Sequence, residues 1–309
     1  MSGISTINSS QPFQLETAGL RGRLIRMGSV IDQIITRQNY PAPVNNLLSE
    51  LLVLAASFAG TLKFAGRFSL QVRGHGPIRT MVADCTNDGA MRGYAGFDET
   101  QFDGGEGLAL FGEAVLAIVV DQSAAGSETY QGIVPLSAKG LTASIREYFW
   151  QSEQVPTGIT LALNENDGHL GWHGAALIVQ SLPQEGDDDP HQGIDHREVE
   201  ADDDWRRIML LMGTIDDNEL LDASDIEHRL LWRLFHEDGI RVFEPLMLSA
   251  GCRCSAKKVQ EMLDTFSADE LAETITADGE ILVTCQFCGE EYRYQQAQVD
   301  TMMQSRSDA

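Results

Sequence analysis

Hydrophobic and polar residues alternate in several short runs along the first part of the chain. The alternation covers 68–73 and 78–83, and side chains that alternate in this way line the two faces of a half-buried strand. A Gly-His-Gly-Pro turn at 74–77 predicts that these two strands form a hairpin. Further strand patterns occur at 108–120, 158–163 and 175–179. We therefore expect residues 13–183 to form one mixed α/β region.

Two segments of this region show helical patterns. Residues 47–54 are almost entirely apolar, which indicates a buried helix, and residues 137–152 place Leu141, Ile145, Tyr148 and Phe149 on one face. The longest apolar run, 51–60, is too short to cross a bilayer. Residues 1–11 are polar and lack the basic start and apolar stretch of a secretory signal. We expect a cytoplasmic protein with no membrane association.

The composition changes sharply at 184–204. This segment contains ten acidic residues and a single base, Arg197, and Pro190 interrupts any regular pattern. A run with so much charge of one sign and so few apolar residues cannot bury enough surface to fold alone. We interpret it as a solvated linker.

Amphipathic helices follow the acidic run. A capping box at 224–227 starts the second of them, and Gly239 is a suitable stop. Their apolar faces need a surface to dock on. Apolar residues recur at helical spacing in two sets: Trp205, Ile208, Leu211, Met212 and Ile215, then Ile226, Leu230, Leu231, Leu234 and Phe235.

The end of the chain combines two short helices with a hairpin. A capping box at 267–270 begins the second helix, and 281–284 and 291–294 have the alternation of paired strands. The first helix has one apolar face, made of Val259, Met262, Leu263 and Phe266.

The charge of the chain excludes some classes of partner. Twenty-two Lys and Arg face 46 Asp and Glu, giving a formal charge of −24. Binding to nucleic acid and to anionic membranes depends on clustered cations. We therefore expect neither of them as a partner.

Four of the five cysteines form two tight pairs, Cys252-x-Cys254 and Cys285-x-x-Cys288, with thirty residues between the pairs. Zn²⁺ takes four thiolates tetrahedrally in closed structural sites, so we predict one Zn²⁺ per chain on these four residues when they are reduced. The surrounding 65 residues, 245–309, are too few for a firm apolar core, so metal binding should contribute much of their folding energy.

These thiols also suggest redox chemistry. A disulfide that closes over one intervening residue is strained, and strained disulfides are labile and often regulatory. Oxidation would remove the thiolate charges on which a metal depends. The residues themselves leave two alternatives open, a redox switch and a purely structural zinc module.

The order of motifs resembles the heat shock protein 33 family of redox-regulated holdase chaperones. The cysteine pattern carries most of this resemblance, which extends over almost the whole chain, although the acidic runs at 187–189 and 202–204 lengthen the linker. The other matching motifs are Arg-Gly-Arg-Leu at 21–24, Leu-Lys-Phe-Ala-Gly at 62–66, Met-Arg-Gly-Tyr-Ala at 91–95, Tyr-Gln-Gly-Ile-Val-Pro-Leu at 130–136, Ser-Glu-Gln-Val-Pro-Thr at 152–157, Leu-Phe-His-Glu at 234–237 and Val-Phe at 242–243.

The resemblance implies a non-enzymatic, ATP-independent chaperone. Its reduced form would be an inactive monomer with zinc on the four cysteines. Oxidation would form the disulfides Cys252–Cys254 and Cys285–Cys288, release the zinc and unfold the metal-binding domain with the helical linker. The oxidised homodimer would then bind unfolded or oxidatively damaged proteins and later pass them to ATP-dependent foldase chaperones.

The predicted architecture is therefore an α+β chain with three parts. These are a mixed α/β N-terminal core domain at 1–183, an acidic and helical linker at 184–244, and a small C-terminal zinc-binding domain at 245–309. We expect Cys85 to be a buried or partly buried bystander and His236 to be a polar-face or packing residue, not a metal ligand.

Two other functions remain as alternatives. A constitutive zinc-ribbon adaptor would bind a single protein or RNA partner without any redox switch. An α/β enzyme with a zinc appendage would need a polar pocket with perturbed titratable groups within 13–183, and the sequence offers no compelling catalytic triad.

Overall fold

The computed structural model describes residues 8–60, 66–122, 129–164, 171–181, 202–222, 224 and 228–307. Contacts divide the chain into two compact units, Met1–Ala250 and Gly251–Ala309. We call them the first and the second unit. Each is described by itself.

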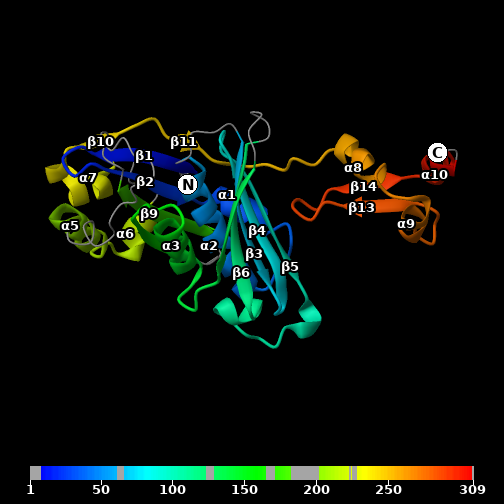
Figure 1. The fold of residues 1–309 in the computed structure, drawn as a ribbon, viewed down its shortest axis with the longest axis horizontal. Helices are drawn as coiled ribbons and strands as arrows, with labels where there is room; N and C mark the ends of the chain where they lie inside the picture. The colour runs from blue at the N-terminus through cyan, green and yellow to red at the C-terminus, as the bar shows by residue number, and fades with distance from the viewer. Residues whose placement is uncertain are drawn as a thin grey trace, which may run out of the picture. The chain divides into compact units, whose positions relative to one another are not determined.

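Two six-stranded sheets form the frame of the first unit (Figure 1). Every pairing between their strands is antiparallel except that of β12 with β5. Sheet A contains β10 (Ile240–Val242), β1 (Ser9–Leu15), β2 (Leu20–Met27), β9 (His173–Ser181) and β8 (Thr157–Asn164) in this order, with β11 (Leu246–Met247) also on β1. Sheet B contains β12 (Ser249–Ala250), β5 (Ala90–Phe97), β4 (Ile78–Thr86), β3 (Arg67–Gly74), β6 (Ala114–Asp121) and β7 (Tyr130–Pro135) in this order.

Helix α2 (Ala42–Ala59) lies between the two sheets and forms the centre of the main core (Figure 1). It is longer than the predicted 47–54, because Pro41 and Pro43 sit at its start, where a missing N–H costs nothing. By length and composition α2 would also suffice to cross a membrane, contrary to our expectation from the shorter run 51–60. In this fold 14 of its 18 residues are buried in the protein.

The remaining helices and turns of the first unit lie around the sheets: α1 (Ser29–Ile35), α3 (Leu141–Gln151), α5 (Asp203–Met212), α6 (Asp217–Leu221), α7 (Arg229–Phe235) and 3₁₀ turns at Glu99–Gln101, Gly107–Phe111 and His236–Asp238. The predicted β3–β4 hairpin and the strands at 158–163 and 175–179 are confirmed. The strand predicted at 108–120 is wrong in its first part. Gly112, with φ of +62°, ends a 3₁₀ turn there, and β6 begins only at Ala114.

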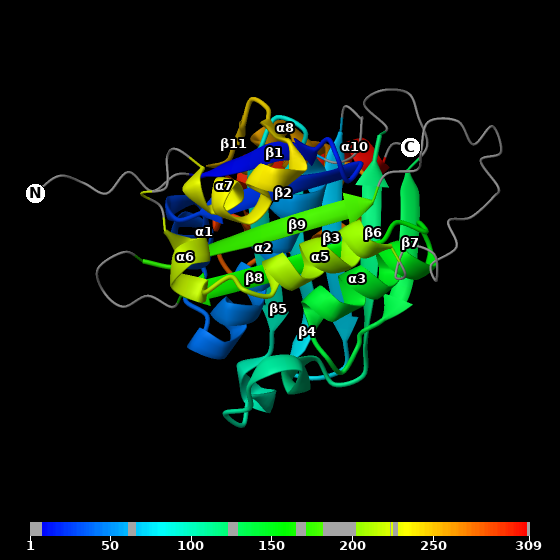
Figure 2. The same cartoon turned by 90° about the vertical axis from the view of Figure 1, so that its left-hand side faces the viewer.

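The helices of the predicted linker cover sheet A on the side away from α2 (Figure 2). Leu24 and Leu177 point to these helices, whereas their neighbours Ile25 and Ala176 point to the core around α2. The apolar faces of α5 and α7 are buried in this second cluster through Trp205, Ile208, Met212, Leu230, Leu231, Leu234 and Phe235. In the structure α5–α7 pack within the first unit. The predicted domain boundaries at 183 and 244 stay a prediction.

One ion pair adds to the docking of α5. The Arg207 guanidinium on α5 binds both carboxylate oxygens of the buried Asp238, with Nη1 at 2.8 Å from Oδ2, and it also contacts Asp204. The Asp238 carbonyl accepts a hydrogen bond from the Thr17 N–H in the β1–β2 turn. Asp238 therefore joins three parts of the first unit. The capping box predicted at 224–227 falls mostly outside the described residues.

Glu50 on α2 provides a test of this packing. Its Oε1 accepts hydrogen bonds from the N–H and the hydroxyl of Thr142 in the first turn of α3, at 3.2 and 2.8 Å. Burial nevertheless raises the pKa of Glu50. The folded protein thus binds this proton more readily than the unfolded chain, so ionisation of Glu50 costs stability as the pH rises above about 4.5.

Replacing Glu50 with Gln keeps the acceptor oxygen and removes the buried charge. We expect Glu50→Gln to raise the melting temperature at pH 7 and to lose this advantage as the pH falls toward 4.5. Glu147→Gln on the exposed face of α3 is the control, with little change expected. Equal melting temperatures of Glu50→Gln and wild type at pH 7 would contradict the claim that the buried charge of Glu50 costs stability.

The second unit contains α8 (Ala256–Leu263), α9 (Ala268–Glu273), the hairpin β13 (Ile281–Thr284) with β14 (Glu291–Tyr294), and α10 (Gln296–Ser307). The predicted capping box at Ser267 and Glu270 and the predicted hairpin are both confirmed. The buried core of this unit is small and consists of Val259, Leu263, Leu271, Ile281, Tyr294 and Val299. So small a core leaves much of the stability to other interactions.

Candidate metal centre

Two loops of the second unit bring its four cysteines together. Cys252 and Cys254 lie in the extended segment just before α8, and Ser255 fixes where this helix begins because its hydroxyl accepts a hydrogen bond from the Lys258 N–H at 3.3 Å. Cys285 and Cys288 lie in the turn between β13 and β14.

The β13–β14 turn has a geometry that requires glycine after the second cysteine. The Cys285 N–H donates to the Glu290 carbonyl at 2.9 Å, and the Gly289 N–H donates to the Cys285 carbonyl at 2.8 Å. Gly289 adopts φ of +73°, a left-handed conformation that glycine tolerates best. This tight turn directs both sulfurs of the Cys-x-x-Cys pair to the same side.

The four sulfurs all lie within 4.8 Å of one another. The Sγ atoms of Cys252 and Cys285 are 3.6 Å apart, and those of Cys254 and Cys288 are 3.4 Å apart. With Zn–S bonds of about 2.3 Å, the sulfurs of a tetrahedral centre are about 3.8 Å apart. The arrangement can therefore hold a metal ion, and among the described residues it is the one such group of metal-ligating side chains.

The thiols have very different proton affinities. Burial acts to raise the pKa of Cys252, but hydrogen bonds from the Cys254 N–H and from the other thiols together lower it to about 7. Burial and the neighbouring thiols raise the pKa of Cys288 to about 12. Four thiolates at this distance repel one another, so they cannot all ionise without a cation among them. This donor set fits a divalent metal that binds sulfur.

All four cysteines are free thiols in the structure. Close sulfur contacts run between the pairs, from Cys252 to Cys285 and from Cys254 to Cys288. The disulfides Cys252–Cys254 and Cys285–Cys288 therefore stay a prediction.

Sequence reasoning missed Tyr292, whose hydroxyl hydrogen bonds with Cys254. The sequence offered one signal for this residue, which is that Tyr292 follows Cys288 by only four positions.

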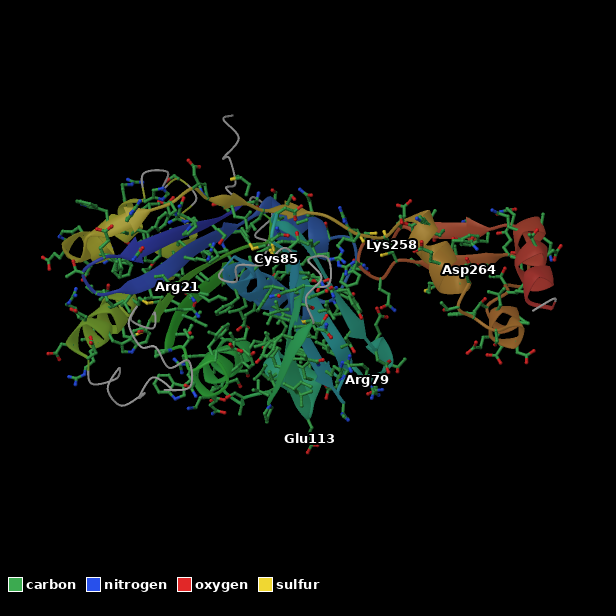
Figure 3. All side chains as sticks on the ribbon, turned by 45° about the horizontal axis from the view of Figure 1, so that its top comes forward. Arg21, Arg79, Cys85, Glu113, Lys258 and Asp264 are labelled. Atoms are coloured by element: carbon green, nitrogen blue, oxygen red, sulfur yellow. The ribbon has the colours of Figure 1, made fainter. Side chains whose placement is uncertain are left out.

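Cys85, labelled in Figure 3, belongs to β4 of the first unit, and its side chain is fully buried. Burial, with the nearby Asp88 and Asp84 carboxylates, raises the pKa of its thiol to about 12. His236 is exposed, and its Nδ1 lies 3.0 Å from the Trp232 carbonyl oxygen. Neither residue belongs to the cysteine group.

The environment of Cys85 predicts that it is inert. The thiolate is the reactive form, and a raised pKa makes it scarce. We expect iodoacetamide at pH 8 to leave Cys85 unmodified in the folded protein and to modify it in guanidinium chloride, as read by mass spectrometry of its peptide. Modification of Cys85 at similar rates in both conditions would be inconsistent with this structure.

The first unit contains a cavity of about 540 Å³ between β1, β2 and the 242–247 segment. Ser9, His228 and Glu244 are among its lining residues, yet the buried Nδ1 of His228 has no hydrogen-bond partner among the described residues. In the part of the chain that the structure describes, no hydrogen bond joins these three side chains into a catalytic relay. The cavity gives no support to the enzyme alternative.

Comparisons with known proteins agree with this architecture. The family model described as Hsp33 protein matches residues 8–295. A 33 kDa chaperonin of Caulobacter vibrioides is 37% identical over 290 residues, covering 91% of this chain and 92% of that protein. The 33 kDa chaperonin of an Escherichia coli strain is 30% identical over 297 residues, covering 96% and 95%.

A solved structure shares the fold. The crystal structure of the 33 kDa chaperonin, a heat shock protein 33 homolog, from Thermotoga maritima has a TM-score of 0.78 to this chain at 21% identity. The match covers 98% of this chain and 100% of that one. The α+β class predicted from the sequence is confirmed, and so is the family resemblance. From the family match over residues 8–295 and the two 33 kDa chaperonins, we conclude that this chain belongs to the Hsp33 family of chaperones.

Proposed function

We propose that the protein is a redox-regulated holdase that binds unfolding or oxidatively damaged proteins without ATP. In the reduced form one Zn²⁺ is held by Cys252, Cys254, Cys285 and Cys288, and the chaperone is inactive. The observation that carries this proposal is the group of four free thiols within 4.8 Å of one another in a unit with a small core. Soft thiolates in a tetrahedral arrangement favour Zn²⁺ over harder cations.

Oxidation turns these ligands into disulfides. Each pair of zinc-bound thiolates, Cys252 with Cys254 and Cys285 with Cys288, gives two electrons to one hydrogen peroxide, and the solvent supplies two protons. One S–S bond forms, the O–O bond breaks, and two waters leave. Because a disulfide sulfur carries no thiolate charge, the second unit loses all four ligands and the folding energy that depends on them.

The surface that would bind clients is the apolar cluster between sheet A and α5–α7. Phe13, Leu15, Leu20 and Leu24 on β1 and β2 are all buried beneath these helices. We infer that loss of the second unit's fold, together with unfolding stress, frees α5–α7 and exposes this face. An exposed apolar face of this kind suits unfolded chains of many sequences.

The proposal includes the predicted partners. We propose a homodimer for the oxidised form, ATP-dependent foldase chaperones as the recipients of the clients, and the cytoplasm as the location. Since reducing compartments keep unpaired thiols reduced, a thiol switch can reset there.

A metal-release experiment separates this function from a constitutive zinc adaptor. The reduced protein is mixed with a colorimetric zinc chelator, then treated with peroxide at a mildly elevated temperature. We expect about one Zn²⁺ per chain, released on oxidation together with a gain in the suppression of client aggregation. Retained metal and no gain in aggregation suppression would favour the adaptor and refute the switch.

A further inference from the structure

The cysteine group lies beside a concentration of positive charge in a strongly acidic protein. The chain has four lysines, and two of them, Lys257 and Lys258, follow the first cysteine pair within six residues of Cys252. Figure 3 labels Lys258 at the start of α8. The two lysines make different contacts, and this difference identifies which of them acts on the site.

Lys258 contacts the backbone between the two cysteines. Its Nζ donates a hydrogen bond to the carbonyl oxygen of Arg253 at 2.8 Å. Lys257, in contrast, points to Glu261 one turn along the helix, with Nζ 3.7 Å from a carboxylate oxygen, and is almost fully exposed. Ser255 holds the Lys258 backbone N–H, so the ammonium group and the cysteine loop are tied at two points.

The Arg253 carbonyl shares its peptide group with the Cys254 N–H. This peptide group lies between the two cysteines of the first pair, so the contact with Lys258 fixes the backbone that carries both sulfurs. Because the Lys258 N–H is in turn held by Ser255, the loop is anchored to the first turn of α8. Loss of the ammonium group would leave the two ligands on a looser loop.

We infer that Lys258 is a positioning residue for the proposed redox site, holding the Cys252–Cys254 loop so that its two sulfurs stay in place as metal ligands and are lost more slowly to oxidants. This inference rests on the proposed function, because it concerns when the thiols oxidise. Lys258 thus acts through the 253–254 peptide group on the rate at which the metal ligands are lost.

The test uses the full-length, reduced, zinc-loaded protein and hydrogen peroxide, a neutral oxidant that is not steered by charge. Zinc release is followed with a colorimetric chelator in wild type, Lys258→Met, Lys258→Arg and Lys257→Met. We expect Lys258→Met to release zinc about threefold faster, the scale of one modest net hydrogen bond. Lys258→Arg should restore the wild-type rate, because Arg also donates to a carbonyl, and Lys257→Met should match wild type.

Each contrary result has a distinct meaning. Equal acceleration by Lys257→Met and Lys258→Met would show that bulk charge is responsible and would overturn the inference. An unchanged rate in Lys258→Met, or no rescue by Lys258→Arg, would also overturn it. Aggregation suppression is measured separately: wild type that releases zinc but gains no holdase activity would refute the proposed function, while the Lys258 comparison would still decide the inference.

Discussion

Replacement of Cys252, Cys254, Cys285 and Cys288 by serine together should unfold the second unit and leave the first unit folded. The second unit has only a small apolar core, and structural zinc contributes on the order of 10 kcal/mol to the folding of comparable small domains. Hydrogen exchange measured by mass spectrometry should show full loss of protection in α8, β13 and β14, with protection retained in α2.

Cys85→Ala is the matched control for this variant. It removes the remaining thiol of the chain, which belongs to the first unit and not to the cysteine group, so the second unit should keep its zinc and its protection from exchange. If the second unit of the quadruple variant stays protected from exchange, the four cysteines are not needed for its folding. That result would contradict the prediction that its small core depends on them.

Replacement of Phe235 by Ala should give the second largest effect, partial chaperone activity in the reduced protein. Phe235 on α7 is fully buried and stacks on Phe13 of β1, with ring centroids 5.7 Å apart. Loss of a buried Phe costs about 3–5 kcal/mol, and in this position the loss weakens the docking of α7 on sheet A. Aggregation of a heat-unfolding client, followed by light scattering, should be reduced without any oxidant.

Trp232→Ala is the control on the same helix. Trp232 is 63% exposed, so its removal should change stability by less than about 0.5 kcal/mol and leave the reduced protein inactive. Hydrogen exchange should rise in α5–α7 of Phe235→Ala but not in α2. Exchange that rises equally in α2 would show general destabilisation and would contradict a role specific to these helices.

The sequence predicted those elements whose pattern depends on neighbouring residues. The β13–β14 hairpin and the Ser267 capping box were found because alternation and capping are local properties. Strands β1 and β2 were missed. In β2, Arg21, Arg23 and Arg26 interrupt the apolar pattern, and their positions make sense only in the folded sheet, where Arg23 contacts Ser10 on β1.

The metal centre was also predictable only where its pattern is local in the sequence. The spacing of the cysteines indicated a single group, and the structure brings these four thiols together. The contact of Lys258 with the Arg253 carbonyl depends on how the loop turns back on α8, which no periodicity reveals. Likewise, the amphipathic pattern of α5 and α7 predicted a buried face but not its partner, and sheet A is that partner.

Light scattering of a heat-unfolding client is the most direct test of the redox-regulated holdase. The client is heated without nucleotide, alone, with the reduced zinc-loaded protein, and with the peroxide-oxidised protein. We predict that the oxidised protein suppresses scattering, that the reduced protein does not, and that the quadruple serine variant shows no response to peroxide. Equal suppression by the reduced and the oxidised protein, or by neither, would contradict the account.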